Sequence, residues 1–206
     1  MSSQKSSSSL NMTTGKPALL LLRFSIPLIL GNIIQQLYGL GDMITVGRVL
    51  GDSSIAAIGT TGCIWGVMFA IASGFTGGLT ILTTQRFGAK DYDGMRNSMV
   101  HAAVLSLTVA FIVTLFSVLF CKSMLSLLRT PPELIDDAET YLKILFYGTP
   151  LMILYNLQAS FLRSVGNSKV PLYFLIFSCV VNLSCDILFL TQFGWGIAGV
   201  AWATNF

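Results

Sequence analysis

The sequence has 206 residues, of which 53% are hydrophobic and only 10% are charged, and its formal net charge is +3. Soluble domains carry about 25% charged residues, so this composition excludes a single water-soluble core and favours a membrane protein. The basic residues are scattered between apolar runs instead of forming a cluster, so no nucleic-acid partner is expected.

Apolar runs follow a polar tail. Residues 1–16 are rich in serine and threonine and are predicted to be a disordered cytoplasmic tail. The remainder, residues 17–206, is predicted to be an all-α, polytopic membrane helix bundle, because its apolar runs reach the roughly 20 residues that a span requires. The predicted spans are Leu19–Val46, Ile55–Leu82, Met99–Phe120, Leu142–Leu162, Pro171–Leu190 and a sixth that begins at Gly196. The sixth stops at Phe206, short of a full span, so we expect it to be truncated.

Three spans carry local features that predict their shape. Pro27 lies inside the first span, where it removes a backbone donor and predicts a kink. The second span is rich in glycine, which predicts close approach of neighbouring helices. Before the fourth span, Thr130, Pro131 and Glu133 have the spacing of a capping box that opens an amphipathic surface helix.

The basic residues predict the orientation. Eight of the twelve Lys and Arg residues lie in three regions: the tail with the start of the first span, the loop after the second span and the loop after the fourth. They are Lys5, Lys16, Arg23, Arg86, Lys90, Arg96, Arg163 and Lys169. Cytoplasmic loops of membrane proteins are enriched in these residues. We therefore expect a multi-pass protein of the cell membrane, plasma or inner, with its N-terminus in the cytoplasm.

Two carboxylates lie in otherwise apolar spans. Asp42 lies near the end of the first span, and Tyr38 precedes it by four residues, so the two side chains share a helical face. Asn182 and Asp186 repeat this spacing in the fifth span. A central Asp costs about 2.5–3.5 kcal/mol on membrane-insertion scales and usually marks an ion pathway or proton relay. The two pairs therefore predict a site that handles protons or cations.

Two further polar residues need an interpretation. Asn156 is more polar than its surroundings in the fourth span, so it either joins this network or makes an ordinary interhelical hydrogen bond. His101 lies one turn inside the third span beside a basic loop, which favours an interfacial histidine over a proton relay.

One motif suggests an enzyme. Gly39-Leu40-Gly41-Asp42 matches the GxGD string of intramembrane aspartyl proteases, in which two carboxylates share a proton. That family also needs a Tyr-Asp motif in an earlier span, but the only such pair here, Tyr92-Asp93, comes later and lies in a charged loop. We therefore predict that the protein is not an enzyme.

Several stretches, in this order and spacing, resemble the multidrug and toxic compound extrusion (MATE) transporters. The resemblance covers nearly everything after residue 17. It rests on YGLGDMITVGRVLG (Tyr38 to Gly51), QRFGAK (Gln85 to Lys90), FLRSVGNSKV (Phe161 to Val170), NLSCD (Asn182 to Asp186) and GIAGVAWAT (Gly196 to Thr204). The family has twelve spans in two six-helix lobes. The resemblance thus implies that residues 17–206 are an incomplete N-terminal lobe, six helices with the sixth truncated, without the C-terminal lobe.

The resemblance also implies site residues. The cation network of the family's N-terminal lobe matches six positions of this sequence: Tyr38, Asp42, Asn156, Asn182, Asp186 and Thr204. The bending proline of its first helix matches Pro27, which is the implied hinge. The coupling ion, H⁺ or Na⁺, stays open, and with Na⁺ the metal ligands would include Asp42 and Asp186. No other cofactor is expected.

The function implied is a secondary active antiporter. It would export drugs or other organic compounds, often cationic, across the lipid bilayer in exchange for H⁺ or Na⁺, together with the missing lobe. Two alternatives stay open. A lipid-linked oligosaccharide flippase or exporter of related architecture would need a basic central cavity, and no span interior here carries Lys or Arg. A non-transporting membrane scaffold would tolerate loss of both carboxylates.

Overall fold

The computed structural model describes residues 17–205, which form six α-helices joined by short connections. The helices are α1 (Pro17–Leu50), α2 (Asp52–Gly88), α3 (Tyr92–Leu127), α4 (Pro132–Ser164), α5 (Lys169–Thr191) and α6 (Gly196–Asn205). No strand occurs in this part of the chain, and the predicted all-α class is confirmed. The predicted disordered tail, residues 1–16, lies outside the described residues.

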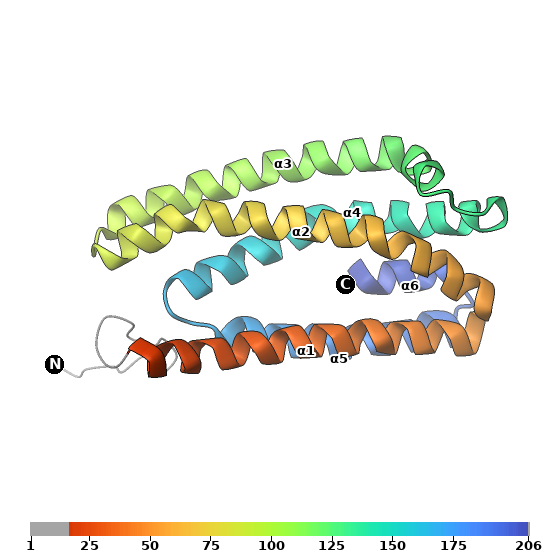
Figure 1. Ribbon diagram of the computed structural model, residues 1–206, viewed down its shortest axis with the longest axis horizontal. Helices are drawn as coiled ribbons and strands as arrows, with labels where there is room; N and C mark the ends of the chain where they lie inside the picture. Colours follow the sequence, from red (N-terminus) through yellow and green to blue (C-terminus); the bar gives the residue numbers. More distant parts are fainter. Residues whose placement is uncertain (1–16, 206) are drawn as a thin grey trace.

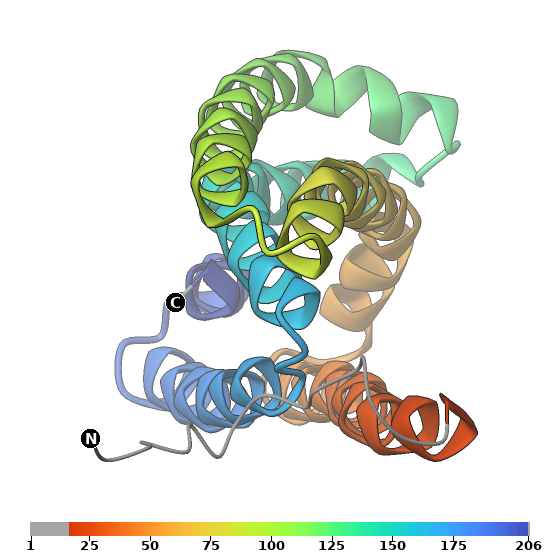
Figure 2. The same cartoon turned by 90° about the vertical axis from the view of Figure 1, so that its left-hand side faces the viewer.

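The helices form two packed groups (Figure 1). In the upper group α2 packs on α3 and α4, and α4 also packs on α3. In the lower group α1 and α5 run side by side along most of their lengths. The short α6 packs on both α4 and α5, so it lies between the groups, as the end-on view also shows (Figure 2). The first turns of α2 rise from the end of α1 into the upper group.

Four of the described helices, α1, α2, α3 and α5, are long and apolar enough to cross a membrane. The predicted fourth span is not among them, because α4 carries polar residues such as Asn156 and Gln158 within its apolar stretch. Asn156 is one of thirteen buried residues of α4, the helix with the most buried residues, whereas Gln158 is exposed. The described part of α6 is too short to span.

The start of α4 differs from the prediction. Pro131 occupies the N-cap position with φ −53° and ψ 139°, no side chain caps the helix, and the Thr130 hydroxyl is buried without a partner. The predicted capping box is therefore wrong. A residue that precedes proline is disfavoured in the helical region, so Pro132 keeps Pro131 extended and delays the helix by one residue. The predicted surface helix and fourth span are one continuous helix.

The glycines of α2 do not make the predicted close contacts. A Cβ atom added at Gly59, Gly66 or Gly77 would meet nothing within 4 Å, and the same holds for the other glycines within this span. The buried stripe of α2 consists instead of Ser54, Ala57, Thr61, Ala72, Thr76, Thr80 and Thr83. These small side chains also allow close approach, which explains the tight packing of α2 on α3 and α4.

Three buried hydroxyls of this stripe, those of Thr61, Thr76 and Thr80, are satisfied within their own helix. Thr83 Oγ1 instead donates to Ser98 Oγ on α3 at 3.5 Å. Thr76 Oγ1 donates to the Ala72 carbonyl at 2.9 Å, and Thr80 Oγ1 donates to the Gly77 carbonyl at 2.8 Å. Such bonds to the preceding turn let threonine pack between helices without an orphaned polar group. The buried residues of α3, which packs on both α2 and α4, are also mostly small: Ser98, Ala102, Ser106, Ala110, Ser117, Cys121 and Leu125.

Candidate functional site

Two carboxylates meet where α1 packs against α5. Asp42 lies on α1 and Asp186 on α5, and the two carboxyl groups are close enough to share a hydrogen bond when one of them carries a proton. Tyr38 lies beside Asp42, one turn earlier on α1. The structure thus brings together two residue pairs that are far apart in the sequence.

Several buried polar atoms of this site have no hydrogen-bond partner. Among the described residues, neither carboxylate oxygen of Asp186 has a partner, and the same is true of Asp42 Oδ1 and of both side-chain polar atoms of Asn182. Asp186 is fully buried and Asn182 is 4% exposed. An unpaired carboxylate in such a place costs several kcal/mol, so it is stable only when it binds a proton or a cation.

The two remaining neighbours come from α4 and α6. Thr204 on α6 lies near the hydroxyls of both Tyr38 and Tyr141, and Tyr141 on α4 is buried beside the carboxylate pair. Thr204 Oγ1 donates its hydrogen to the Val200 carbonyl at 3.0 Å, which leaves its lone pairs available to a ligand. α6 itself is held on α4 by Asn205, whose side-chain Nδ2 donates to the Ile144 carbonyl at 2.6 Å.

The oxygens of this site suit a proton or a small hard cation. No group of three His, Cys, Asp or Glu residues that could hold a metal is found within residues 17–205. A cation held by Asp42 and Asp186 would therefore complete its shell with neutral oxygens. Side-chain oxygens of Tyr38, Asn182 and Thr204 are the available donors, and oxygen ligands are those that hard cations prefer.

Asn156 lies apart from the carboxylates. Its Nδ2 donates to the Met152 carbonyl at 2.9 Å, and its Oδ1 accepts from Ser73 Oγ on α2 at 3.4 Å. α4 reaches the carboxylate pair with Tyr141, and at 1.5 Å per residue Asn156 is about 22 Å further along the same helix. α4 is continuous from Pro132 to Ser164, so the two residues lie at different levels of the bundle and belong to different sites.

Asn156 instead lines a cavity of about 490 Å³ between α1, α2, α4 and α5. Pro27 also lines this cavity and is buried, and α1 continues through it as a helix to Leu50. The remaining polar lining is formed by Asn32, Gln35, Ser73, Tyr155, Arg163 and Ser168. The predicted hinge of α1 thus lies in the wall of a cavity that has both polar and apolar lining residues.

The sequence analysis missed two residues of these sites. Arg163 lies in a predicted loop, yet the structure places it half-buried in the cavity wall, where its Nη2 donates to Ser160 Oγ at 3.1 Å. It follows Asn156 by seven residues, a spacing that places both on one helical face and could have revealed it. Tyr141 fell between the predicted surface helix and the predicted fourth span.

Comparisons with known proteins agree with this architecture. The model of the MatE family matches residues 27–188. In Bacillus subtilis (strain 168), the probable multidrug resistance protein YoeA is 33% identical over 88% of this chain and 40% of its own length. The probable multidrug resistance protein YpnP of the same organism is 33% identical over 94% of this chain and 44% of its own length.

Solved structures give the same picture. The crystal structure of MATE in the bent conformation superposes with a TM-score of 0.86 at 29% identity, over 93% of this chain and 42% of the other. An outward-facing multidrug resistance MATE family transporter of the MOP superfamily gives a TM-score of 0.85 at 28% identity, with the same coverage. The chain thus spans about two fifths of the length of these relatives.

Proposed function

The chain belongs to the MatE family, and from that premise we propose that it forms one lobe of a secondary antiporter that exports organic compounds in exchange for H⁺ or Na⁺. The observation that carries the proposal is the pair Asp42 and Asp186, which meets between α1 and α5 with its buried oxygens lacking donors. Buried carboxylates within membrane spans usually mark ion pathways or proton relays. Tyr38, Asn182 and Thr204 would assist in binding.

The coupling would act through α1. A neutralised carboxylate tolerates apolar packing better than an ionised one, so the arrival of an ion stabilises a closer fit of α1 against α5. Pro27 lies in α1 and in the wall of the cavity, so a bend there would change the cavity's shape. A compound held in the cavity would be released on the outer side, as in other alternating-access transporters.

One observation favours the second candidate function, a flippase or exporter of lipid-linked oligosaccharides. Arg163 places a guanidinium in the cavity wall, where it could bind a pyrophosphate. It is the single Lys or Arg among the described residues that line this cavity, and most of the other polar groups are neutral amides and hydroxyls. The antiporter therefore stays the better-supported proposal, since the relatives described above are named for multidrug resistance.

Transport in vesicles tests the proposal. The complete gene product, reconstituted into proteoliposomes, should move a fluorescent organic cation such as ethidium when an H⁺ or Na⁺ gradient is imposed. An ionophore that collapses that gradient should stop the movement within the same experiment. If transport proceeds equally with no gradient of either ion, the antiport proposal is wrong. Movement of a pyrophosphate-linked lipid alone would support the second candidate instead.

The orientation gives a separate prediction. The start of α1 and the α2–α3 and α4–α5 connections lie at one end of the bundle, and we propose that this end faces the cytoplasm (Figure 1). In a variant without native cysteines, Ser53→Cys should react with an impermeant maleimide from outside, and Lys90→Cys should react only after the membrane is opened. Both positions are exposed, whereas Ser54 is buried and unsuitable. The opposite labelling pattern would reverse the orientation.

A further inference from the structure

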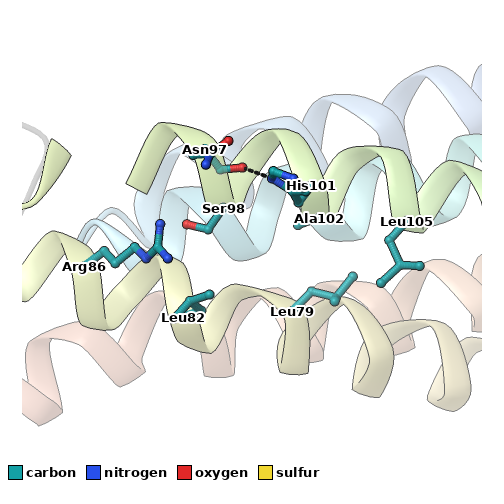
Figure 3. A pocket seen from close by; sticks show the side chains of 8 residues that line it. All are labelled: Leu79, Leu82, Arg86, Asn97, Ser98, His101, Ala102 and Leu105. Carbon is teal, nitrogen blue, oxygen red and sulfur yellow. Dashed lines mark hydrogen bonds between the residues drawn. The ribbon is translucent and has the colours of Figure 1, made fainter. Parts of the chain in front are cut away.

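A second pocket lies between α2 and α3, near the connection that joins them. It has a volume of about 290 Å³. Figure 3 shows its polar residues, Arg86, Asn97 and Ser98, gathered at the end next to the connection, and Leu79 and Leu105 at the other end. His101 lies between the two groups. The carboxylate site is formed by other helices, so this pocket has no part in the proposed ion coupling.

The polar end can bind an anion. The Arg86 guanidinium donates from Nη1 to the Gly94 carbonyl at 2.5 Å, which fixes its position and leaves its other N–H groups free. His101 Nδ1 donates to the Asn97 carbonyl at 2.7 Å, which leaves Nε2 as an acceptor for a hydroxyl group of a ligand. The ion pairs found among the described residues both involve Glu139. The Asp91 carboxylate lies near the Arg86 guanidinium, on the other side of Gly94, but forms no ion pair with it, so Arg86 keeps N–H donors for a ligand.

The apolar end continues the pocket towards the middle of the bundle. Leu82 and Leu105 are 48% and 46% exposed on the outer faces of α2 and α3, where lipid chains would surround them. Leu79 lies seven residues before Arg86, which corresponds to a depth of about 10 Å along the helix. The pocket therefore presents the Arg86 guanidinium and neutral polar groups at the level of the headgroups, and it is apolar at the level of the first acyl carbons.

We propose that this pocket binds an anionic phospholipid, with its phosphate at Arg86, a headgroup hydroxyl at His101 and the upper part of an acyl chain against Leu79, Leu82 and Leu105. The polar-to-apolar order along the pocket matches the order of groups in a lipid molecule. By the proposed orientation the site faces the cytoplasmic leaflet, where anionic lipids attract basic residues with about 1 kcal/mol per charge. The bound lipid would contact both α2 and α3 and so stabilise the packing of these two helices.

Native mass spectrometry of the complete gene product tests this assignment. Detergent-solubilised protein is titrated with phosphatidylglycerol or phosphatidylcholine that carry the same acyl chains. We expect phosphatidylglycerol to bind more tightly, and Arg86→Gln to weaken its binding about fivefold, the equivalent of about 1 kcal/mol for one charge, with phosphatidylcholine unaffected. Arg96→Gln is the matched control, because Arg96 is exposed on the same hairpin but does not line the pocket.

Further variants separate the possible outcomes. Leu105→Trp fills the apolar end and should weaken binding of both lipids, and His101→Gln tests the polar end if Arg86→Gln fails to fold. Equal losses in Arg86→Gln and Arg96→Gln would show general surface charge and overturn the proposal. Glycerol 3-phosphate, the headgroup fragment without chains, should not displace the lipid at matched concentration. Displacement by it would show a free-anion site instead of a lipid site.

Discussion

The change Asp186→Asn should reduce gradient-driven efflux by the complete gene product by at least about tenfold, which requires the loss of only about 1.4 kcal/mol of ion-binding free energy. Asp186 is fully buried, and its two oxygens have no donor among the described residues. Asparagine keeps the size of the side chain but can neither gain a proton nor neutralise a cation. Efflux of ethidium from proteoliposomes under an imposed H⁺ or Na⁺ gradient measures the effect.

The same variant separates a functional carboxylate from a structural one. Because an unpaired buried carboxylate destabilises the fold, the asparagine variant should melt at the same temperature as the unmodified protein or higher. Asp136→Asn is the matched control: it replaces the same side chain at an exposed position of α4, so it should leave efflux unchanged. Gradient-driven efflux by Asp186→Asn at the unmodified rate would show that this carboxylate does not couple ion binding to transport.

Phe146→Ala should lower the free energy of unfolding by more than any of the other substitutions. Phe146 is fully buried on α4 and belongs to a cluster that includes Ala57 of α2 and Leu125 of α3, so it joins three helices. Between a protein interior and lipid the transfer of apolar groups contributes little, so the cavity is the main cost. A cavity of about 100 Å³ costs about 2–3 kcal/mol at roughly 24 cal/mol per Å³.

Thermal unfolding in a mild detergent measures this loss. Phe111→Ala on α3 removes the same ring from a side chain that is 70% exposed, so it should leave the melting temperature nearly unchanged. Equal shifts in the two variants would mean that Phe146 does not join the three helices, and would contradict the assignment of α4 as the central helix of the upper group.

The local part of the carboxylate site could be predicted because it depends on helical period alone. Tyr38 and Asp42 share a face of one helix, as do Asn182 and Asp186, whatever surrounds those helices. The pairing of α1 with α5 depends on tertiary packing between segments far apart in the sequence, so no local sequence pattern predicts it. Asn156 illustrates the limit: its polarity is visible in the sequence, but its distance from the carboxylates follows from the path of α4.

Small residues show a second limit. Glycine and threonine both permit close contact, and the sequence of α2 offers stripes of each. The structure buries the threonines, including Thr76 and Thr83, and leaves the glycines without near neighbours. Burial leaves neither hydroxyl unsatisfied, since Thr76 bonds to its own helix and Thr83 bonds to Ser98 of α3, and threonine loses less backbone freedom on folding than glycine. Composition alone does not choose between these two faces.

The pairing of α1 with α5 has a consequence for synthesis in the cell. α1 ends at Leu50 and α5 begins at Lys169, and at about 5–20 residues per second the stretch between them takes on the order of ten seconds to make. During that interval Asp42 is already in the first inserted helix while Asp186 and Asn182 are still unmade. A nascent chain must therefore hold this acid at the membrane surface, in protonated form or within the insertion machinery. Variants that slow the arrival of α5 would lower the amount of protein recovered, not the turnover of each finished molecule.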